Sequence, residues 1–86
     1  MRVSIITPEQ VVLACDAHQV LVPGTKSPFA MLDNHQAIIS SLVLNGLVKI
    51  TKPDGSEVRV QIEGNCIVEQ HENLVSILAT KARVEQ

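Results

Sequence analysis

Apolar and polar residues alternate most regularly in residues 56–62, where aliphatic side chains fall on one side and charged or amide side chains on the other. A period of two residues predicts a β-strand with one buried face, made here by two valines and Ile62. The preceding Lys-Pro-Asp-Gly at 52–55 provides proline to set φ and glycine to accept a positive φ. This turn predicts a hairpin in which residues 46–51 pair with the 56–62 strand.

Turn-forming residues interrupt the apolar segments about every ten positions, a spacing typical of all-β sandwiches and barrels. One of these turns, Glu72-Asn73, predicts a second hairpin between residues 66–70 and 74–79, because asparagine tolerates the left-handed conformation. Another, Gly64-Asn65, is expected to separate two strands. The sequence therefore predicts one domain over residues 1–86: an antiparallel β-sandwich of about eight to ten short strands with negligible helix.

Several apolar segments do not alternate. They are Val11-Val12-Leu13, Val20-Leu21-Val22, Ile38-Ile39 and Leu42-Val43-Leu44. A strand that is apolar on both sides needs cover on both sides. Either the fold itself or a partner protein is expected to supply that cover.

Composition narrows the classes of function. The net charge is −2 and Phe29 is the only aromatic residue, so the chain has neither the basic surface nor the stacking platforms of a nucleic-acid-binding protein. No apolar run reaches the ~20 residues of a membrane span, and Met1-Arg2 opens no signal-peptide pattern. We expect a soluble cytosolic protein with no direct membrane insertion.

Residues that could support chemistry are few and scattered. His18, His35 and His71 lie on separate segments without close pairs of ligands, so no metal site is predicted. Cys15 and Cys66 are interpreted as packed thiols rather than as a disulfide or the nucleophile of a Cys-His hydrolase, because no nucleophile signature surrounds either one. The four glycines are isolated in turns, so no phosphate-binding loop is formed. We predict no catalytic, cofactor-binding or metal-binding residues.

Motifs along nearly the whole chain match one known family in order and spacing. They are the runs 5–9 (Ile-Ile-Thr-Pro-Glu), 20–25 (Val-Leu-Val-Pro-Gly-Thr) followed by Phe29, Leu32 and His35, 46–50 (Gly-Leu-Val-Lys-Ile), 54–55 (Asp-Gly), 62–65 (Ile-Glu-Gly-Asn) and 75–79 (Val-Ser-Ile-Leu-Ala). In these runs the chain resembles the β-sandwich part of the epsilon subunits of F-type ATP synthases. A small ligand-binding β-module is the alternative, although such modules usually show surface aromatics.

This resemblance implies a non-catalytic rotor subunit of the central stalk, held between the gamma subunit and the ring of membrane-embedded subunits. It would lie peripherally at the cytoplasmic face of the cell membrane and couple ion translocation to ATP synthesis. By resemblance, Lys26, Ser27, Pro28 and Phe29 face the ring, while His35 and Ser40 face gamma. The simpler interpretations are an ordinary surface loop for residues 26–29 and a solvated surface histidine for His35. We expect Phe29 to be a core anchor beneath the loop rather than a direct contact.

The chain also departs from the family pattern. Members usually carry an acidic residue and glycines where this chain has Lys26-Ser27-Pro28, and glycines where it has Asn34 and Asn65. Many members continue into a two-helix hairpin implicated in ATP binding and inhibition, whereas this sequence stops at Gln86. We therefore expect a naturally short or truncated member that cannot inhibit ATP hydrolysis by extending helices.

Overall fold

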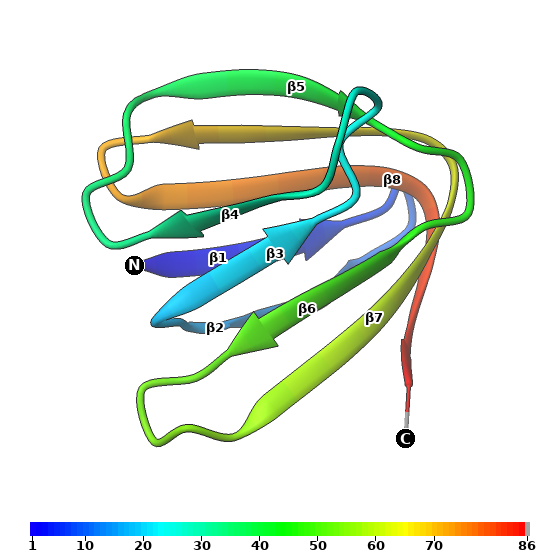
Figure 1. Ribbon diagram of the computed structural model, residues 1–86. Coiled ribbons are helices and arrows are strands. Elements are labelled where there is room, and N and C mark those ends of the chain that lie inside the picture. The colour runs from blue at the N-terminus through cyan, green and yellow to red at the C-terminus, as the bar shows by residue number, and fades with distance from the viewer. Residues whose placement is uncertain (86) are drawn as a thin grey trace.

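The computed structural model describes residues 1–85, which form eight strands and no helix (Figure 1). The strands are β1 (Arg2–Ile6), β2 (Val11–Asp16), β3 (Gln19–Val22), β4 (Phe29–Leu32), β5 (Ile38–Leu42), β6 (Leu47–Thr51), β7 (Glu57–His71) and β8 (Leu74–Glu85). The all-β prediction is confirmed, and no helix in the described residues could span a membrane.

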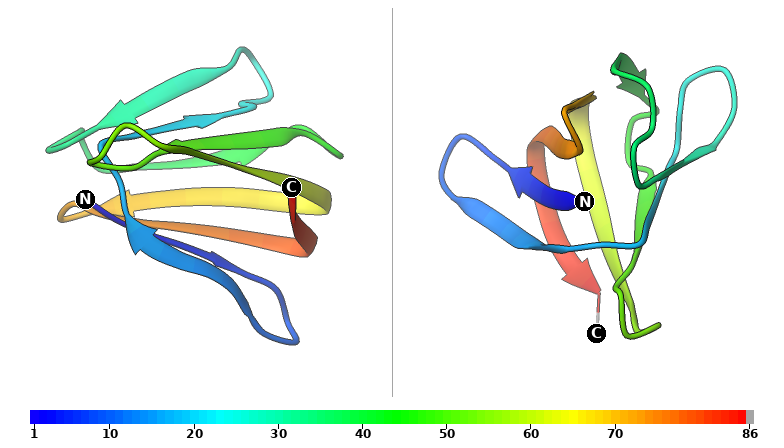
Figure 2. Two further views of the ribbon diagram at one scale, coloured as in Figure 1. Left: turned by 90° about the horizontal axis from the view of Figure 1, so that it is seen from below. Right: turned by 90° about the vertical axis from the view of Figure 1, so that its left-hand side faces the viewer.

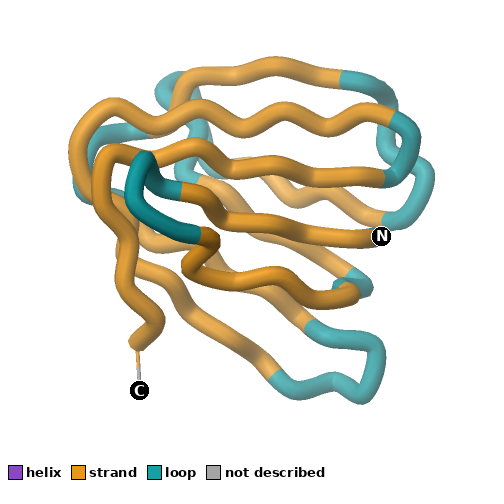
Figure 3. The backbone as a smooth tube through the Cα atoms, turned by 180° about the vertical axis from the view of Figure 1, so that it is seen from behind, coloured by secondary structure: helices purple, strands orange, loops and turns teal. Residues whose placement is uncertain are grey.

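All eight strands belong to one hydrogen-bonded sheet that folds over into two layers, because β7 and β8 are long and bend together (Figures 1 and 3). The first layer runs β2, β1, β8 (residues 74–79), β7 (66–71) and β5. The second layer runs β8 (81–85), β7 (59–63), β6, β3 and β4. Figure 2 shows the two layers from two further directions.

The bend in β7 corrects one prediction. Gly64-Asn65 does not separate two strands but forms a bulge within β7, where the register shifts between Glu63 and Cys66. Gly64 has a φ of 77°, and a Cβ atom there would lie 2.7 Å from Cβ of Thr80 on the neighbouring strand. A bulge adds a residue to one strand and increases its local twist, which turns the pair from one layer into the other.

Both predicted hairpins are confirmed. In the turn between β6 and β7, Gly55 has a φ of 90° and its amide donates to the carbonyl of Lys52 at 2.9 Å. Between β7 and β8, Glu72 and Asn73 both adopt positive φ, at 52° and 63°. Two successive left-handed residues match the twist of paired strands, which is why such turns close hairpins.

One pairing could not be read from the turns. β1 and β8 run parallel, with Ile5 opposite Ile77 and Ile6 opposite Leu78, whereas every other pair of strands in residues 1–85 is antiparallel. β8 also continues to Glu85, beyond the expected end at Ala79. Pairing between the first and the last strand is decided by packing rather than by local turn chemistry.

The core lies between the two layers and is almost entirely aliphatic. Every second residue of each central strand points inward, and the predicted inner face of β7 is confirmed because Val60 and Ile62 are fully buried and Val58 packs against them. Isoleucine and valine suit this position since their branched side chains pack well on a pleated surface. The opposite sides of the same strands form the two outer faces of the molecule.

Candidate protein-interaction site

The loop between β3 and β4, residues 23–28, is tied to the edge of β5. Gly24 forms an isolated bridge with Leu42, the Thr25 amide donates to the Ser41 carbonyl at 3.3 Å, and the Val43 amide donates to the Pro23 carbonyl at 2.8 Å. These backbone bonds hold a loop rich in hydroxyl groups against an edge strand. A loop anchored in this way presents its side chains in a defined geometry.

A surface cleft of about 260 Å³ lies between this loop and β5. It is lined by Gly24, Thr25, Lys26, Ser27, Phe29, Ile38, Ile39 and Ser40, a set we call the Lys26 cleft. The fold thus gathers four of the six residues that the resemblance assigned to partner binding: Lys26, Ser27, Phe29 and Ser40. Pro28 is exposed in the same loop but does not line the cleft.

His35 lies apart from that cleft, past the other end of β4. It is half-buried, its ring Nδ1 lies 2.8 Å from the Gln36 carbonyl oxygen, and its own carbonyl accepts a hydrogen bond of 2.9 Å from Nε2 of Gln70. Gln70 is buried, and its Oε1 has no partner among residues 1–85. Sequence reasoning missed Gln70, because a single amide at an inward position of a strand carries no distinctive signal.

Phe29 packs against the hydrophobic core and is half-buried, so its interpretation as a core anchor beneath the loop is confirmed. Its ring also explains the glycine at position 24. A Cβ atom on Gly24 would lie 2.9 Å from two ring carbons and 2.5 Å from the Ser27 carbonyl oxygen. The loop therefore folds closely over the aromatic ring.

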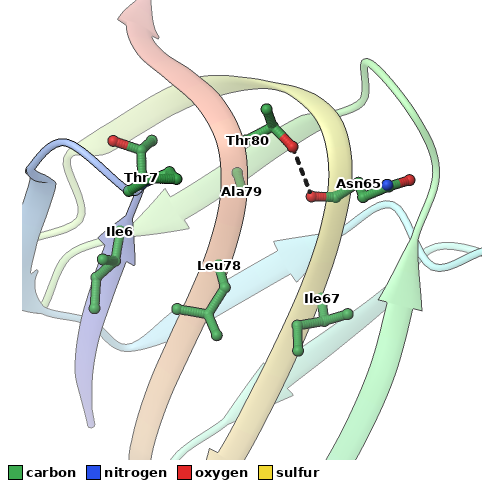
Figure 4. A pocket seen from close by; sticks show the side chains of 8 residues that line it. Ile6, Thr7, Asn65, Ile67, Leu78, Ala79 and Thr80 are labelled. Atoms are coloured by element: carbon green, nitrogen blue, oxygen red, sulfur yellow. Dashed lines mark hydrogen bonds between the residues drawn. The ribbon is translucent and has the colours of Figure 1, made fainter.

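The outer face of the first layer carries an apolar row that crosses three strands. Ile6, Leu78 and Ile67 are direct cross-strand neighbours on β1, β8 and β7, and Val11 stands beside Ile6 on β2. Ile6, Leu78 and Ile67 border a shallow cleft of about 390 Å³, and Figure 4 shows these three side chains side by side. The signal for this row was present in the sequence, since residues 66–68 and 77–79 are apolar without alternation.

Two of the apolar segments that do not alternate, 11–13 and 38–39, are not covered on both sides by the fold. Val11 is 59% exposed and Ile39 is 72% exposed, so the fold leaves one side of both segments open. Both belong to the edge strands of the first layer, β2 and β5. The two exposed residues therefore lie at opposite edges of the layer rather than in one contiguous patch.

Groups for catalysis do not converge in the described residues. Residues 1–85 contain no cluster of three or more His, Cys, Asp or Glu side chains that could hold a metal ion. Both cysteines are free, Cys15 half-buried and Cys66 buried, as the packed-thiol interpretation predicted. Burial raises the pKa of the Cys66 thiol, which lowers the fraction of thiolate available as a nucleophile.

Two layers of strands around one aliphatic core define the class of this protein as a small all-β sandwich domain. The family described as "ATP synthase, Delta/Epsilon chain, beta-sandwich domain" matches residues 1–85. This chain belongs to that family.

Two relatives differ in how much of their length is matched. An ATP synthase epsilon chain from a Sulfurovum species is 35% identical over 78 residues, which cover 91% of this chain and 60% of the relative. One from Frankia casuarinae is 33% identical over 84 residues and covers 98% of this chain and 96% of the relative. The chain therefore spans under two thirds of the first relative and nearly all of the second.

The fold also matches solved structures. A chain in the Euglena gracilis mitochondrial ATP synthase structure, which is titled as OSCP, F1 and c-ring, superposes with a TM-score of 0.86 at 12% identity. That match covers 95% of this chain and 51% of the other. At this level of identity the likeness shows the fold alone, and it agrees with the predicted β-sandwich.

Proposed function

We propose that this chain is a non-catalytic rotor subunit of a rotary ATP synthase, placed in the central stalk between the gamma subunit and the membrane ring. The observation that carries the proposal is the match of the epsilon-type sandwich family over residues 1–85. In this role the chain couples ion translocation to ATP synthesis mechanically. It lies peripherally at the cytoplasmic face of the cell membrane as part of the complex.

Two features of the fold support a mechanical role. The two layers are closed by short turns and share an aliphatic core, and a close-packed interior of this kind resists deformation. The Lys26 cleft and the apolar row offer two separate adhesive surfaces. A stiff body with two adhesive surfaces can transmit torque from one partner to the other.

We assign the partners as follows. The loop 26–29 faces the ring, and His35 and Ser40 lie toward gamma. Ser40 lies on β5, the edge strand of the first layer, which also carries the exposed Ile39. We place the main gamma surface on the apolar row of that layer's outer face, clear of the Lys26 cleft that Ser40 and Ile39 also line, because burial of aliphatic area contributes most to binding.

The test is co-purification. The tagged chain is expressed with the gamma subunit and the ring subunits of the same organism, and the captured partners are identified after gentle extraction. We expect gamma to be captured by the chain, and the ring to be captured when gamma and the chain are both present. A wild-type chain that folds and captures neither partner would contradict the proposed function.

A further inference from the structure

The Lys26 cleft differs in charge from the other surface clefts of the molecule. Lys26 is its one charged lining residue, and no ion pair among residues 1–85 includes Lys26. Three other clefts each combine a basic side chain with a carboxylate: Glu63 beside Lys81, Glu69 beside His71, and Glu85 beside Arg59. The Lys26 cleft therefore has a positive charge that the protein itself does not neutralise, although the whole chain is acidic.

Polar donors and an apolar wall accompany this charge. The hydroxyls of Thr25 and Ser27 make no hydrogen bond within residues 1–85, so both can donate to an incoming oxygen. Phe29, Ile38 and Ile39 also line the cleft and supply apolar contact. One cation, two hydroxyls and an apolar wall suit an acidic side chain, whose carboxylate and methylene stem need these two environments.

Size and charge argue against other anions. About 260 Å³ is below the usual range for a cofactor or drug-sized ligand, but it can take one or two side chains of a partner. A phosphate group would bring up to two negative charges to a single lysine. Anionic membrane surfaces attract clusters of four or more basic residues, and this loop carries one.

We infer that the Lys26 cleft receives an aspartate or glutamate side chain from a polar loop of the membrane-ring subunits. The inference rests on the proposed function and specifies the chemistry of its ring contact. The close fold of the loop over Gly24 and Phe29 holds the site in shape before binding, which reduces the ordering that docking requires. Opposite charges at such a contact set partner choice and association rate.

The experiment measures how much ring the assembled chain and gamma retain as salt is raised from about 50 to about 500 mM. We compare the wild-type chain with Lys26→Glu and Lys26→Gln. The matched control is Lys52→Glu, which makes the same reversal in the β6–β7 turn, outside the cleft. Thermal unfolding of each isolated variant checks that the fold is intact.

At low salt we expect Lys26→Glu to weaken ring retention about two- to tenfold, with a smaller loss for Lys26→Gln and none for Lys52→Glu. The difference should fade as salt rises. As a rescue test, each acidic residue of the ring loop is replaced by lysine, one at a time. One of these ring variants should restore binding to the Lys26→Glu chain. That rescue would identify the partner carboxylate.

Three results would overturn the inference. Retention that is unchanged in Lys26→Glu at every salt concentration would reject the charge contact while leaving the proposed function intact. Binding of the isolated chain to phosphatidylglycerol vesicles that is lost in Lys26→Glu would reassign the cleft to a lipid headgroup. A wild-type chain that binds gamma but never the ring would reject the ring contact in the proposed function itself.

Discussion

The two outer faces of this sandwich differ in chemistry although β7 and β8 contribute to both. On the first layer, Leu78 of β8 stands between Ile6 and Ile67. On the second layer, Arg59 of β7 stands between Lys49 and Glu85, and its Nε donates to Glu57 at 2.8 Å. Next to the bend at Gly64 the same two strands thus have an apolar outer row on one side and charged outer residues on the other, while Glu69 and His71 lie at the far end of β7 in the first layer.

This difference indicates which outer face is suited to remain exposed to solvent. Charged neighbours of alternating sign stay solvated on the second layer and discourage other molecules from binding there. The exposed aliphatic row of the first layer gains free energy when it is covered. The bend is therefore a boundary between a charged outer face and an outer face with an apolar row, which we propose as the docking face, and the predictions below test that proposal.

Gly64→Ala should have the largest effect on stability, because it alters the bulge at which the sheet bends between the two faces. The alanine Cβ meets Thr80 at 2.7 Å, and the positive φ adds strain, so we expect a loss of about 2–4 kcal/mol in the free energy of unfolding. Gly55→Ala is the control, since its φ is also positive but nothing lies within 4 Å of the new Cβ. It should lose only about 1–2 kcal/mol.

Urea unfolding of the two glycine variants measures this difference directly. Equal losses at both positions would mean that close contact with Thr80 does not matter at the bend. The boundary between the faces would then depend on backbone conformation alone.

Leu78→Asp tests the docking face. The side chain is 42% exposed, so the free energy of unfolding of the isolated chain should change by no more than about 1 kcal/mol. Binding to gamma should weaken at least about tenfold, because a carboxylate would be buried in an apolar contact.

The control is Lys81→Asp, on the charged stretch of the same strand, which should leave gamma binding unchanged. Comparable losses in both variants, measured by titration with purified gamma, would contradict the assignment of one docking face.

Glu57→Gln should have the smallest effect, visible only in the pH dependence of stability. The hydrogen bond from the Arg59 guanidinium lowers the pKa of Glu57 below its ordinary value of 4.5. A carboxylate with a lowered pKa stabilises the folded state above that ordinary value, and this contribution is lost as the pH falls through the folded-state pKa. The glutamine variant should therefore lose less stability on acidification than the wild type.

Urea midpoints recorded between about pH 7 and about pH 3 provide the measurement. Glu69→Gln is the matched change on the first layer, where no ion pair among residues 1–85 involves that carboxylate. If Glu57→Gln and the wild type lost the same stability between these pH values, the Glu57–Arg59 pair would contribute nothing to the free energy of unfolding.

Much of the fold was available from local sequence signals. The turns at Gly55 and Asn73, the buried face of β7 and the packed cysteines all follow from residues within a few positions of one another, because turn conformation and alternation are local properties. For the candidate site, the resemblance supplied the residues but not their arrangement. It assigned Lys26 to the ring side and Ser40 to the gamma side, and only the structure shows that both residues line one cleft.

The sequence by itself therefore determined that this chain is an all-β sandwich of the epsilon type with an aliphatic core. Only the tertiary structure decided that β1 lies parallel to β8, that Gly64 bends a strand instead of ending it, and which side of Ile38-Ile39 stays open. Each of these depends on contacts between residues far apart in the chain. Such contacts are selected by how well whole layers pack together, and the composition of a short segment does not encode that fit.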